Sequence, residues 1–182
     1  AVENATGRLR LSRRADGYET EVAQGRNFRR VMVDRYGLAL DVIKGSLSNI
    51  PKDGPLILLA NPPYGNLDGL MMGHMLQERR GDFRILAHHV FRRAEELNRT
   101  ILPVDFAETK EAMRLNLAAR KKALNYLSDG GAIGSFPGGT VSTSARPFST
   151  PMDPTWRTFT SKMITKSGAR VVPMFFDGTN SR

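Results

Sequence analysis

The chain has 182 residues, 40% of them hydrophobic and 25% charged, which is the composition of one globular domain rather than of a disordered chain. It contains no cysteine, which excludes a disulfide scaffold, a thiol nucleophile and a cysteine-ligated zinc site. With only three histidines we also expect no metal site. The net charge of +9 favours an anionic partner: a membrane surface, an acidic carrier protein or nucleic acid. Nucleic acid is the least favoured, because no zinc-finger spacing, aromatic ribonucleoprotein motif or basic region joined to heptads is present.

The first third of the chain is predicted to lead from a polar segment into a central strand. Residues 1–20 are rich in arginine, and we expect a flexible basic arm there. Apolar residues at helical spacing predict a short amphipathic helix over residues 28–36, and an alternating pattern predicts a strand over residues 38–43. After a turn at residues 51–55, the unbroken apolar run of residues 56–60 is typical of a strand covered on both faces.

The rest of the chain alternates helices with strands. We expect helices over residues 68–80, 90–97, 108–127 and 155–166. We expect strands over residues 83–87, 101–104, 132–136 and 171–176. Asp68 is the predicted N-cap of the first of these helices, and Ser167-Gly168 is the predicted end of the last. The predicted apolar stripe of the longest helix consists of Met113, Leu117, Leu124 and Leu127.

This alternation predicts a layered α/β fold, in which helices flank a mostly parallel central sheet. We expect residues 21–182 to form this single domain. The chain stops at Arg182, directly after a predicted strand, so we expect the natural protein to continue and the domain to be incomplete at its C-terminus. No apolar stretch is long enough to cross a bilayer, and the first residues do not have the pattern of a signal peptide. We therefore expect a cytoplasmic location.

Two short loop motifs, each directly after a predicted buried strand, mark the candidate site. They read Asn61-Pro62-Pro63-Tyr64-Gly65-Asn66-Leu67-Asp68-Gly69 and Phe136-Pro137-Gly138-Gly139-Thr140-Val141-Ser142. Strand-end loops rich in glycine, proline and hydroxyl groups commonly build the sites of α/β proteins. Two weaker blocks follow the same order, Thr100 to Phe106 and Val171 to Phe175. Over residues 38–182 the four blocks resemble the glycerolipid acyltransferase family, the lysophospholipid acyltransferases that include 1-acylglycerol-3-phosphate acyltransferase.

The resemblance implies a reaction and a departure from it. Such enzymes move a fatty acyl group from acyl-CoA or acyl carrier protein to a lysophospholipid hydroxyl, with no bound cofactor or metal. A histidine removes the hydroxyl proton while an aspartate orients its ring. Asp68 matches the aspartate, but Pro62 stands at the histidine position of a family branch with a slightly longer spacing. Loss of a general base costs on the order of 100- to 10,000-fold in rate, so we expect an impaired enzyme. The alternative is a non-catalytic lipid- or acyl-carrier-binding protein on the same fold.

The second motif resembles the family's Phe-Pro-Glu-Gly-Thr-Arg block, to which acceptor binding is attributed. Gly138 and Val141 stand at its two charged positions, and Phe106 replaces an arginine in the block before it. Backbone N–H groups and hydroxyls of this loop could still cradle an anion, or the loop could simply be flexible. The resemblance therefore implies a set of substrate-binding residues: Tyr64, Gly65, Phe136, Pro137, Gly138, Gly139, Thr140, Ser142 and Arg146.

The remaining candidates are basic. His88-His89 lies at a predicted strand end and is either a replacement base or a solvent-facing pair, whereas His74 is expected to pack. Five basic residues form either a face toward an anionic membrane or an acyl carrier protein, or an ordinary solvated helix face: Arg92, Arg93, Arg114, Lys121 and Lys122. The first of these alternatives would place the protein peripherally on the inner face of the membrane.

Overall fold

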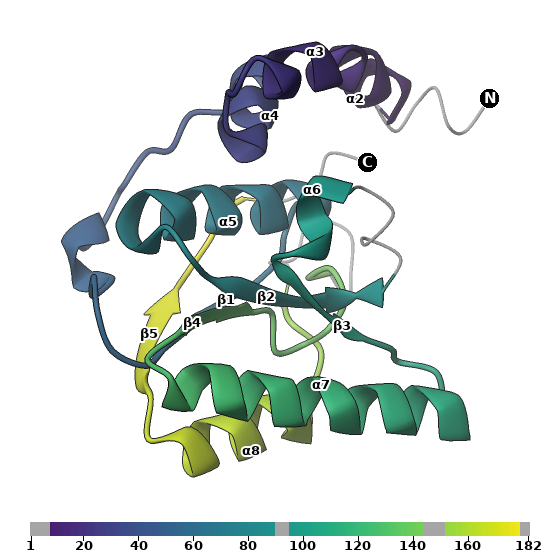
Figure 1. Ribbon diagram of the computed structural model, residues 1–182, viewed down its shortest axis with the longest axis vertical. Helices are drawn as coiled ribbons and strands as arrows, with labels where there is room; N and C mark the ends of the chain where they lie inside the picture. Colours follow the sequence, from purple (N-terminus) through teal and green to yellow (C-terminus); the bar gives the residue numbers. More distant parts are fainter. Residues whose placement is uncertain (1–7, 90–94, 144–151, 179–182) are drawn as a thin grey trace.

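The centre of the molecule is a parallel sheet of five strands among the residues that the structure describes (Figure 1). The structure is a computed structural model and describes residues 8–89, 95–143 and 152–178. The strands are β1 (Leu56–Ala60), β2 (Arg84–His88), β3 (Ile101–Val104), β4 (Ala132–Ser135) and β5 (Arg170–Met174). Their order is β3-β2-β4-β1-β5, and every neighbouring pair is parallel. The predicted layered α/β fold with a parallel central sheet is confirmed.

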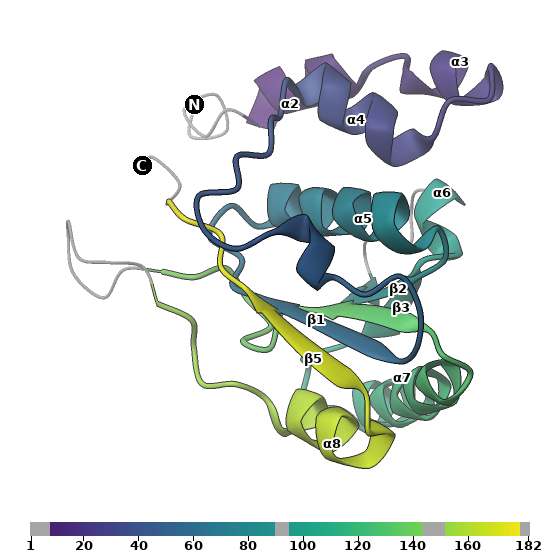
Figure 2. The ribbon, with the colours of Figure 1, turned by 90° about the vertical axis from the view of Figure 1, so that its left-hand side faces the viewer.

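Helices cover both faces of the sheet (Figures 1 and 2). Helix α5 (Asn66–Arg80) covers one face, and α4 (Phe28–Tyr36) packs on its outer side. Helices α7 (Lys110–Ser128) and α8 (Thr158–Ser167) cover the other face. The remaining helices are α2 (Arg8–Ala15), α3 (Tyr18–Ala23), α6 (Glu95–Asn98) and the 3-10 turn η1 (Leu47–Asn49).

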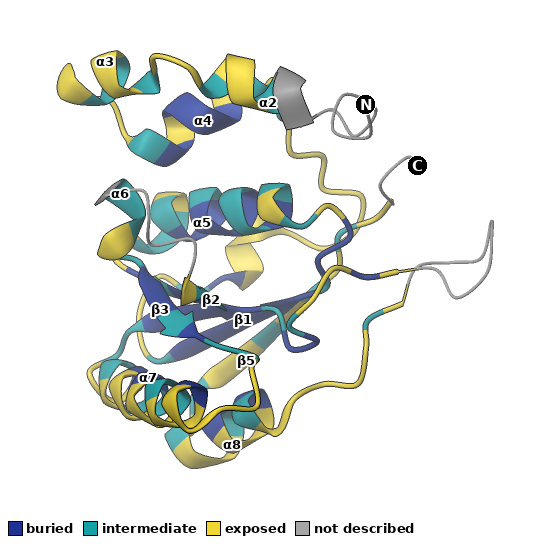
Figure 3. Cartoon of the chain, turned by 90° about the vertical axis from the view of Figure 1, so that its right-hand side faces the viewer, coloured by how far each residue is buried: buried dark blue, intermediate teal, exposed yellow. Residues whose placement is uncertain are grey.

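Burial follows from this layering (Figure 3). All five residues of β1 are buried, as expected for a parallel strand with helices on both sides. Its side chains alternate between two cores: Leu56 and Leu58 pack under α5, while Ile57 and Leu59 pack against α7 and α8. The two faces of β1 therefore belong to two separate cores, which is why residues 56–60 are apolar without a break.

The N-terminal segment is largely helical where it is described. Helix α2 and the start of α3 occupy much of the segment for which we expected a flexible arm. Two arginines connect this segment to α4. Arg35 donates to the backbone carbonyls of Arg14, Asp16 and Gly17, and Arg14 donates to the carbonyl of Tyr36 at 2.6 Å.

The predicted strand at residues 38–43 is wrong. The segment has no regular structure, and Ile43 is 79% exposed. Strand β1, which follows it, already pairs with β4 and β5 on its two sides, and none of the described strands pairs with the segment, which connects α4 to the sheet. The helix predicted over 28–36 and the strands predicted over 56–60 and 101–104 are present with those bounds, and the other predicted helices and strands are present with shifted ends. Residues 90–94 of the helix predicted over 90–97 lie outside the described part.

The predicted apolar stripe of α7 is only partly buried. Leu127 is buried, but Met113 and Leu117 are 70% and 58% exposed. The helix meets the sheet mainly through small residues, Ala112, Ala119 and Ala123. Alanine is only weakly hydrophobic, so the sequence pattern does not identify an alanine face as the buried one. The prediction instead followed the larger apolar side chains on the neighbouring face of the helix.

Candidate functional site

The strand-end motifs come together at the carboxyl edge of the sheet. The backbone N–H of Ser142 donates to the carbonyl of Pro62 at 3.1 Å, which joins the second motif to the first. The side chain of Asn61 then binds the chain after β5: its amide donates to the carbonyl of Phe176 and its oxygen accepts from the Phe176 N–H, both at 2.8 Å. Three segments far apart in the sequence are therefore held in one wall by a backbone hydrogen bond and by the side chain of Asn61.

Asp68 stabilises the first motif from inside. Helix α5 begins at Asn66 with Gly65 as its N-cap, so the prediction that Asp68 is the N-cap is wrong; it lies in the first turn. Its carboxylate is 2% exposed and accepts from the backbone N–H of Tyr64 at 2.6 Å. Burial raises the pKa of Asp68 to about 6, although the hydrogen bonds from the N–H groups of Tyr64 and Gly65 oppose that rise. The group titrates close to neutral pH.

The second motif forms a tight turn. The N–H of Gly139 donates to the carbonyl of Phe136 at 3.0 Å, and Gly139 has a φ of 77°, which favours glycine. A Cβ on Gly138 would lie 3.0 Å from Cδ of Pro154, so a glutamate at this position would require Pro154 to move slightly. The loop is built around its glycines.

The hydroxyl of Ser142 has a partner within the protein. It donates to the carboxylate of Asp153 at 2.6 Å, and the residue is 7% exposed. Arg146, the guanidinium expected beside this loop, lies outside the described residues.

Arg157 is the guanidinium that the structure places at this turn, and the sequence analysis missed it. Its guanidinium carbon lies 4.4 Å from the ring centre of Phe106, and its Nε would be 3.0 Å from a Cβ on Gly139. Its backbone N–H donates to the carbonyl of Pro137 at 3.1 Å. The only sequence signal was Phe106, an aromatic at a position where the resembled family has arginine; an aromatic face there can bind a cation from elsewhere in the chain.

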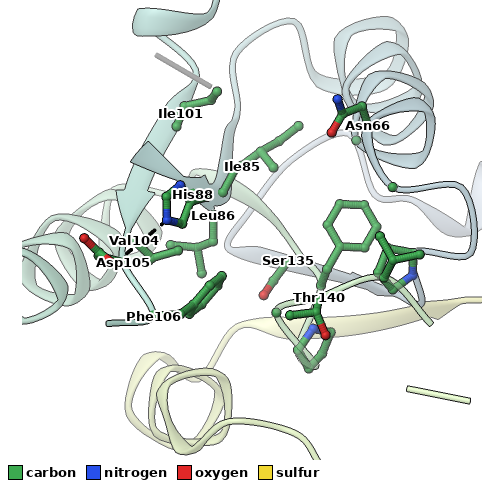
Figure 4. Close-up of a pocket in the computed structure, with 18 of the residues that line it drawn as sticks. Asn66, Ile85, Leu86, His88, Ile101, Val104, Asp105, Phe106, Ser135 and Thr140 are labelled. Atoms are coloured by element: carbon green, nitrogen blue, oxygen red, sulfur yellow. Dashed lines mark ion pairs between the residues drawn. The ribbon is translucent and has the colours of Figure 1, made fainter. Parts of the chain in front are cut away.

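These loops border a cavity of about 1870 Å³ (Figure 4). Among the predicted site residues, those that line it are Pro62, Tyr64, Gly65, Phe136, Pro137, Gly139 and Thr140. Asp68, Gly138 and Ser142 are buried and do not line it. Ile85 and Ile101 lie on the side of Asn66, and Phe106 lies toward α8, so the cavity extends past the sheet edge on both faces. The exposed Met113 and Leu117 of α7 also line it.

The cavity wall is mainly apolar with a basic part. Lys110, Arg114 and Arg120 of α7 line it together with Arg157, whereas Lys121 and Lys122 are exposed elsewhere on α7. Arg92 and Arg93 lie outside the described residues. A cavity larger than ordinary small-molecule pockets, with apolar walls and a few cations, suits an elongated amphiphile with an anionic group.

Two histidines meet an aspartate at the ends of β2 and β3. Asp105 oxygens lie 3.9 Å from Nε2 of His88 and 3.4 Å from Nδ1 of His89, and His88 and Asp105 line the cavity (Figure 4). The backbone N–H of Ala107, and then the two imidazoles, hold the pKa of Asp105 below its usual range. One donor atom from each of the three residues lies within 4.8 Å of the others, a set that a divalent transition metal could accept.

His74, the remaining histidine of the chain, is half-buried on α5.

Comparison with protein families decides the class. A family model described as acyltransferase matches residues 22–182. The chain belongs to the acyltransferase family. The motif loops of this acyltransferase fall within the matched region, so the family predicted from them is confirmed at that level. No curated protein is significantly similar to the acyltransferase. None of its described helices is both long and apolar enough to span a bilayer.

Proposed function

We propose that the cavity holds a fatty acyl chain, and that the fold serves transfer of this acyl group from acyl-CoA or acyl carrier protein to a lysophospholipid hydroxyl, as in enzymes of the 1-acylglycerol-3-phosphate acyltransferase type. The observation that carries the proposal is the position of the two motif loops against a largely apolar cavity of about 1870 Å³. A donor with a long hydrocarbon chain fits such walls, and the exposed Met113 and Leu117 find an apolar partner in it.

In this reaction the acceptor oxygen forms a bond to the thioester carbonyl carbon, and the carbon–sulfur bond breaks. The acceptor proton passes to a base, and the thiolate leaves with a proton. Position 62 lines the cavity, where a base would meet the acceptor hydroxyl, but the proline ring has no basic atom. The proposal therefore includes an impairment on the order of 100- to 10,000-fold relative to a histidine at this position.

The basic residues of the wall suit the charged parts of the substrates. Arg157, Lys110 and Arg114 line the cavity and would attract the phosphate of a lysophospholipid. The net charge of +9 would hold the protein peripherally on an anionic membrane, or draw an acidic acyl carrier protein to it.

A non-catalytic protein that binds lipid or acyl carrier is the second candidate. Pro62 is the observation that favours it, since the cavity is intact while the base is absent. Both candidate proteins would bind the same lipid or acyl carrier, but only the acyltransferase would transfer the acyl group.

Acyl transfer to a panel of lysophospholipids, from labelled acyl-CoA and acyl carrier protein, separates these candidates. We would compare the chain as it stands with Pro62→His, with Pro62→Asn as a matched control that lacks a base, and with Pro62→His/Asp68→Asn. Activity that rises at least 100-fold in Pro62→His, and not in Pro62→Asn, supports the acyltransferase proposal. Equal activity in all forms points to another base, which His88→Asn and His89→Asn would test. Silence in all forms, with acyl chains still bound, favours the binding protein.

A further inference from the structure

Arg29 of α4 is a buried cation without an acidic partner among the described residues. It is 5% exposed, and none of the ion pairs between described residues involves it. One side-chain nitrogen donates to Oγ1 of Thr100 at 2.6 Å, and the guanidinium carbon lies 4.6 Å from the ring centre of Phe83. Burial lowers the pKa of Arg29 to about 10, so the side chain stays charged at neutral pH.

The surrounding structure leaves space for this side chain. Gly73 of α5 faces it, and a Cβ on Gly73 would overlap Nε of Arg29. The same Cβ would lie 3.3 Å from Cδ1 of Ile85 on the sheet. A glycine in the middle of a helix costs about 1 kcal/mol relative to alanine, and here it admits the guanidinium between α5 and the sheet.

The guanidinium has donors left for a ligand. It carries five N–H groups, and among the described residues its only side-chain hydrogen bond is the one to Thr100. No buried side-chain nitrogen or oxygen in the described part lacks a partner, so the other nitrogens of Arg29 are not fully enclosed. Arg29 is among the residues that line the cavity, so a ligand in the cavity lies within reach of its side chain.

The Arg29 end of the cavity is distinct from the motif loops. Phe83 precedes β2 and Thr100 precedes β3, whereas the loops follow the carboxyl ends of the strands. Strand β2 spans five residues, which corresponds to about 13 Å. Ile85 and Ile101 are paired neighbours on β2 and β3 and line the cavity beside this end.

We propose that Arg29 binds the anionic group of an amphiphile whose hydrocarbon part lies over Ile85 and Ile101. A charge buried without a counter-charge is costly, and a carboxylate or phosphate in the cavity offsets that cost with charge-assisted hydrogen bonds. The anion is either the carboxylate of a fatty acid or the phosphate of a lysophospholipid; both present oxygens to the guanidinium. The inference rests on the proposed function only in that the cavity takes a hydrocarbon chain.

The test compares three probes with the same chain length: dodecanoate, dodecyl phosphate and the neutral dodecanol. Calorimetric titration of the intact chain is expected to show at least one anion binding about tenfold or more tightly than dodecanol, the size of one hydrogen bond to a charged group. Arg29→Met is expected to lose most of this preference while still binding dodecanol, and Arg29→Lys to keep part of it. Arg30→Met is the matched control, because Arg30 is the exposed neighbour on α4; it should bind like the unmodified chain.

Nitrogen-15 NMR of the unmodified chain localises the contact. The Nε–H signal of Arg29, assigned by its loss in Arg29→Lys, should shift on saturation with the tighter anion and not with dodecanol. This measurement also decides the matter if Arg29→Met does not fold. Preference for dodecanoate identifies a fatty acid as the source, and preference for dodecyl phosphate identifies a phosphorylated head group.

Failures of the two proposals give different results. If dodecanol binds as tightly as both anions, or the Nε–H signal stays in place at saturation, the Arg29 inference is overturned and the acyl-chain cavity stands. If none of the three probes binds, the cavity does not take a hydrocarbon chain, and both proposals fail.

Discussion

Replacement of Asp68 by asparagine tests the electrostatics of the candidate site without changing its shape. Asparagine retains a side-chain oxygen that can accept from the N–H of Tyr64, so the contact that holds the first motif is preserved. The charge is the main difference between the two forms. We therefore expect Asp68→Asn to fold, and to differ from the unmodified chain in how its stability depends on pH.

The sign follows from the pKa values. The pKa of Asp68 is about 6 in the folded chain against 3.8 without the surrounding structure. As pH rises from about 4 to 6, the unfolded chain loses the proton first, so the folded chain binds more protons and its free energy of unfolding falls. The shift of about 2 pKa units corresponds to a loss of ~3 kcal/mol across this window. The contribution of neutral Asp68 to the stability of the folded chain is fully present below pH 4 and is lost above pH 6.

The assay is urea denaturation followed by circular dichroism at pH 4, 5, 6 and 7.5 for both forms. Other titrating groups, including Asp105, whose pKa is lowered, contribute to both curves and cancel in the difference. We expect Asp68→Asn to gain up to ~3 kcal/mol of unfolding free energy relative to the unmodified chain between pH 4 and pH 7.5. A difference that does not change with pH, or that changes in the opposite direction, would refute the reasoning that burial dominates at Asp68.

Two further substitutions test the wall of the site. Asn61→Ala removes both hydrogen bonds to Phe176 and should lower the free energy of unfolding by about 2 kcal/mol. Asn61→Asp keeps the acceptor but turns a carboxylate oxygen toward the Phe176 carbonyl in place of the amide donor, so it should cost at least as much; a smaller loss would contradict this account. Gly139→Ala should cost about 1–2 kcal/mol for its positive φ plus the contact with Arg157. Gly54→Ala is its control, since Gly54 also has a φ of 77° but no atom within 4 Å of a new Cβ; equal losses in chemical denaturation would exclude the Arg157 contact.

The sheet could be predicted from the sequence because its strands carry the signal themselves. Residues 56–60 are an apolar run of strand length and residues 132–135 a short run of apolar and small residues, and burial on both faces explains them without further context. Residues 38–43 show the limit of this reasoning. Their alternation is real, but a strand also needs a pairing partner: β1 is paired on both sides, and no described strand pairs with this segment. Strand formation depends on a partner that local sequence does not reveal.

The candidate site, like the fold, has a part that could be predicted from the sequence and a part that could not. The motif loops could be predicted because each directly follows a buried strand, and parallel strands bring their carboxyl ends to one edge. Arg157 and Arg29 could not be predicted. Each depends on an aromatic ring elsewhere in the chain, Phe106 for the first and Phe83 for the second, and on space left by a glycine of another element. Such cation sites arise from packing between segments that are distant in the sequence, so hydrophobic periodicity and motif spacing do not predict them.

The contacts of the first motif also explain how the fold can persist without a histidine at position 62. The loop is held by the carbonyl of Pro62, which accepts from Ser142, and by the carboxylate of Asp68, which accepts from the N–H of Tyr64. Neither contact uses a side chain at position 62. Asp68 therefore stabilises the loop independently of any role beside a base, and a change at position 62 alters the chemistry of the cavity while leaving its wall in place. For the same reason we expect a single substitution, Pro62→His, to place in this wall the base that the proposed acyl transfer requires.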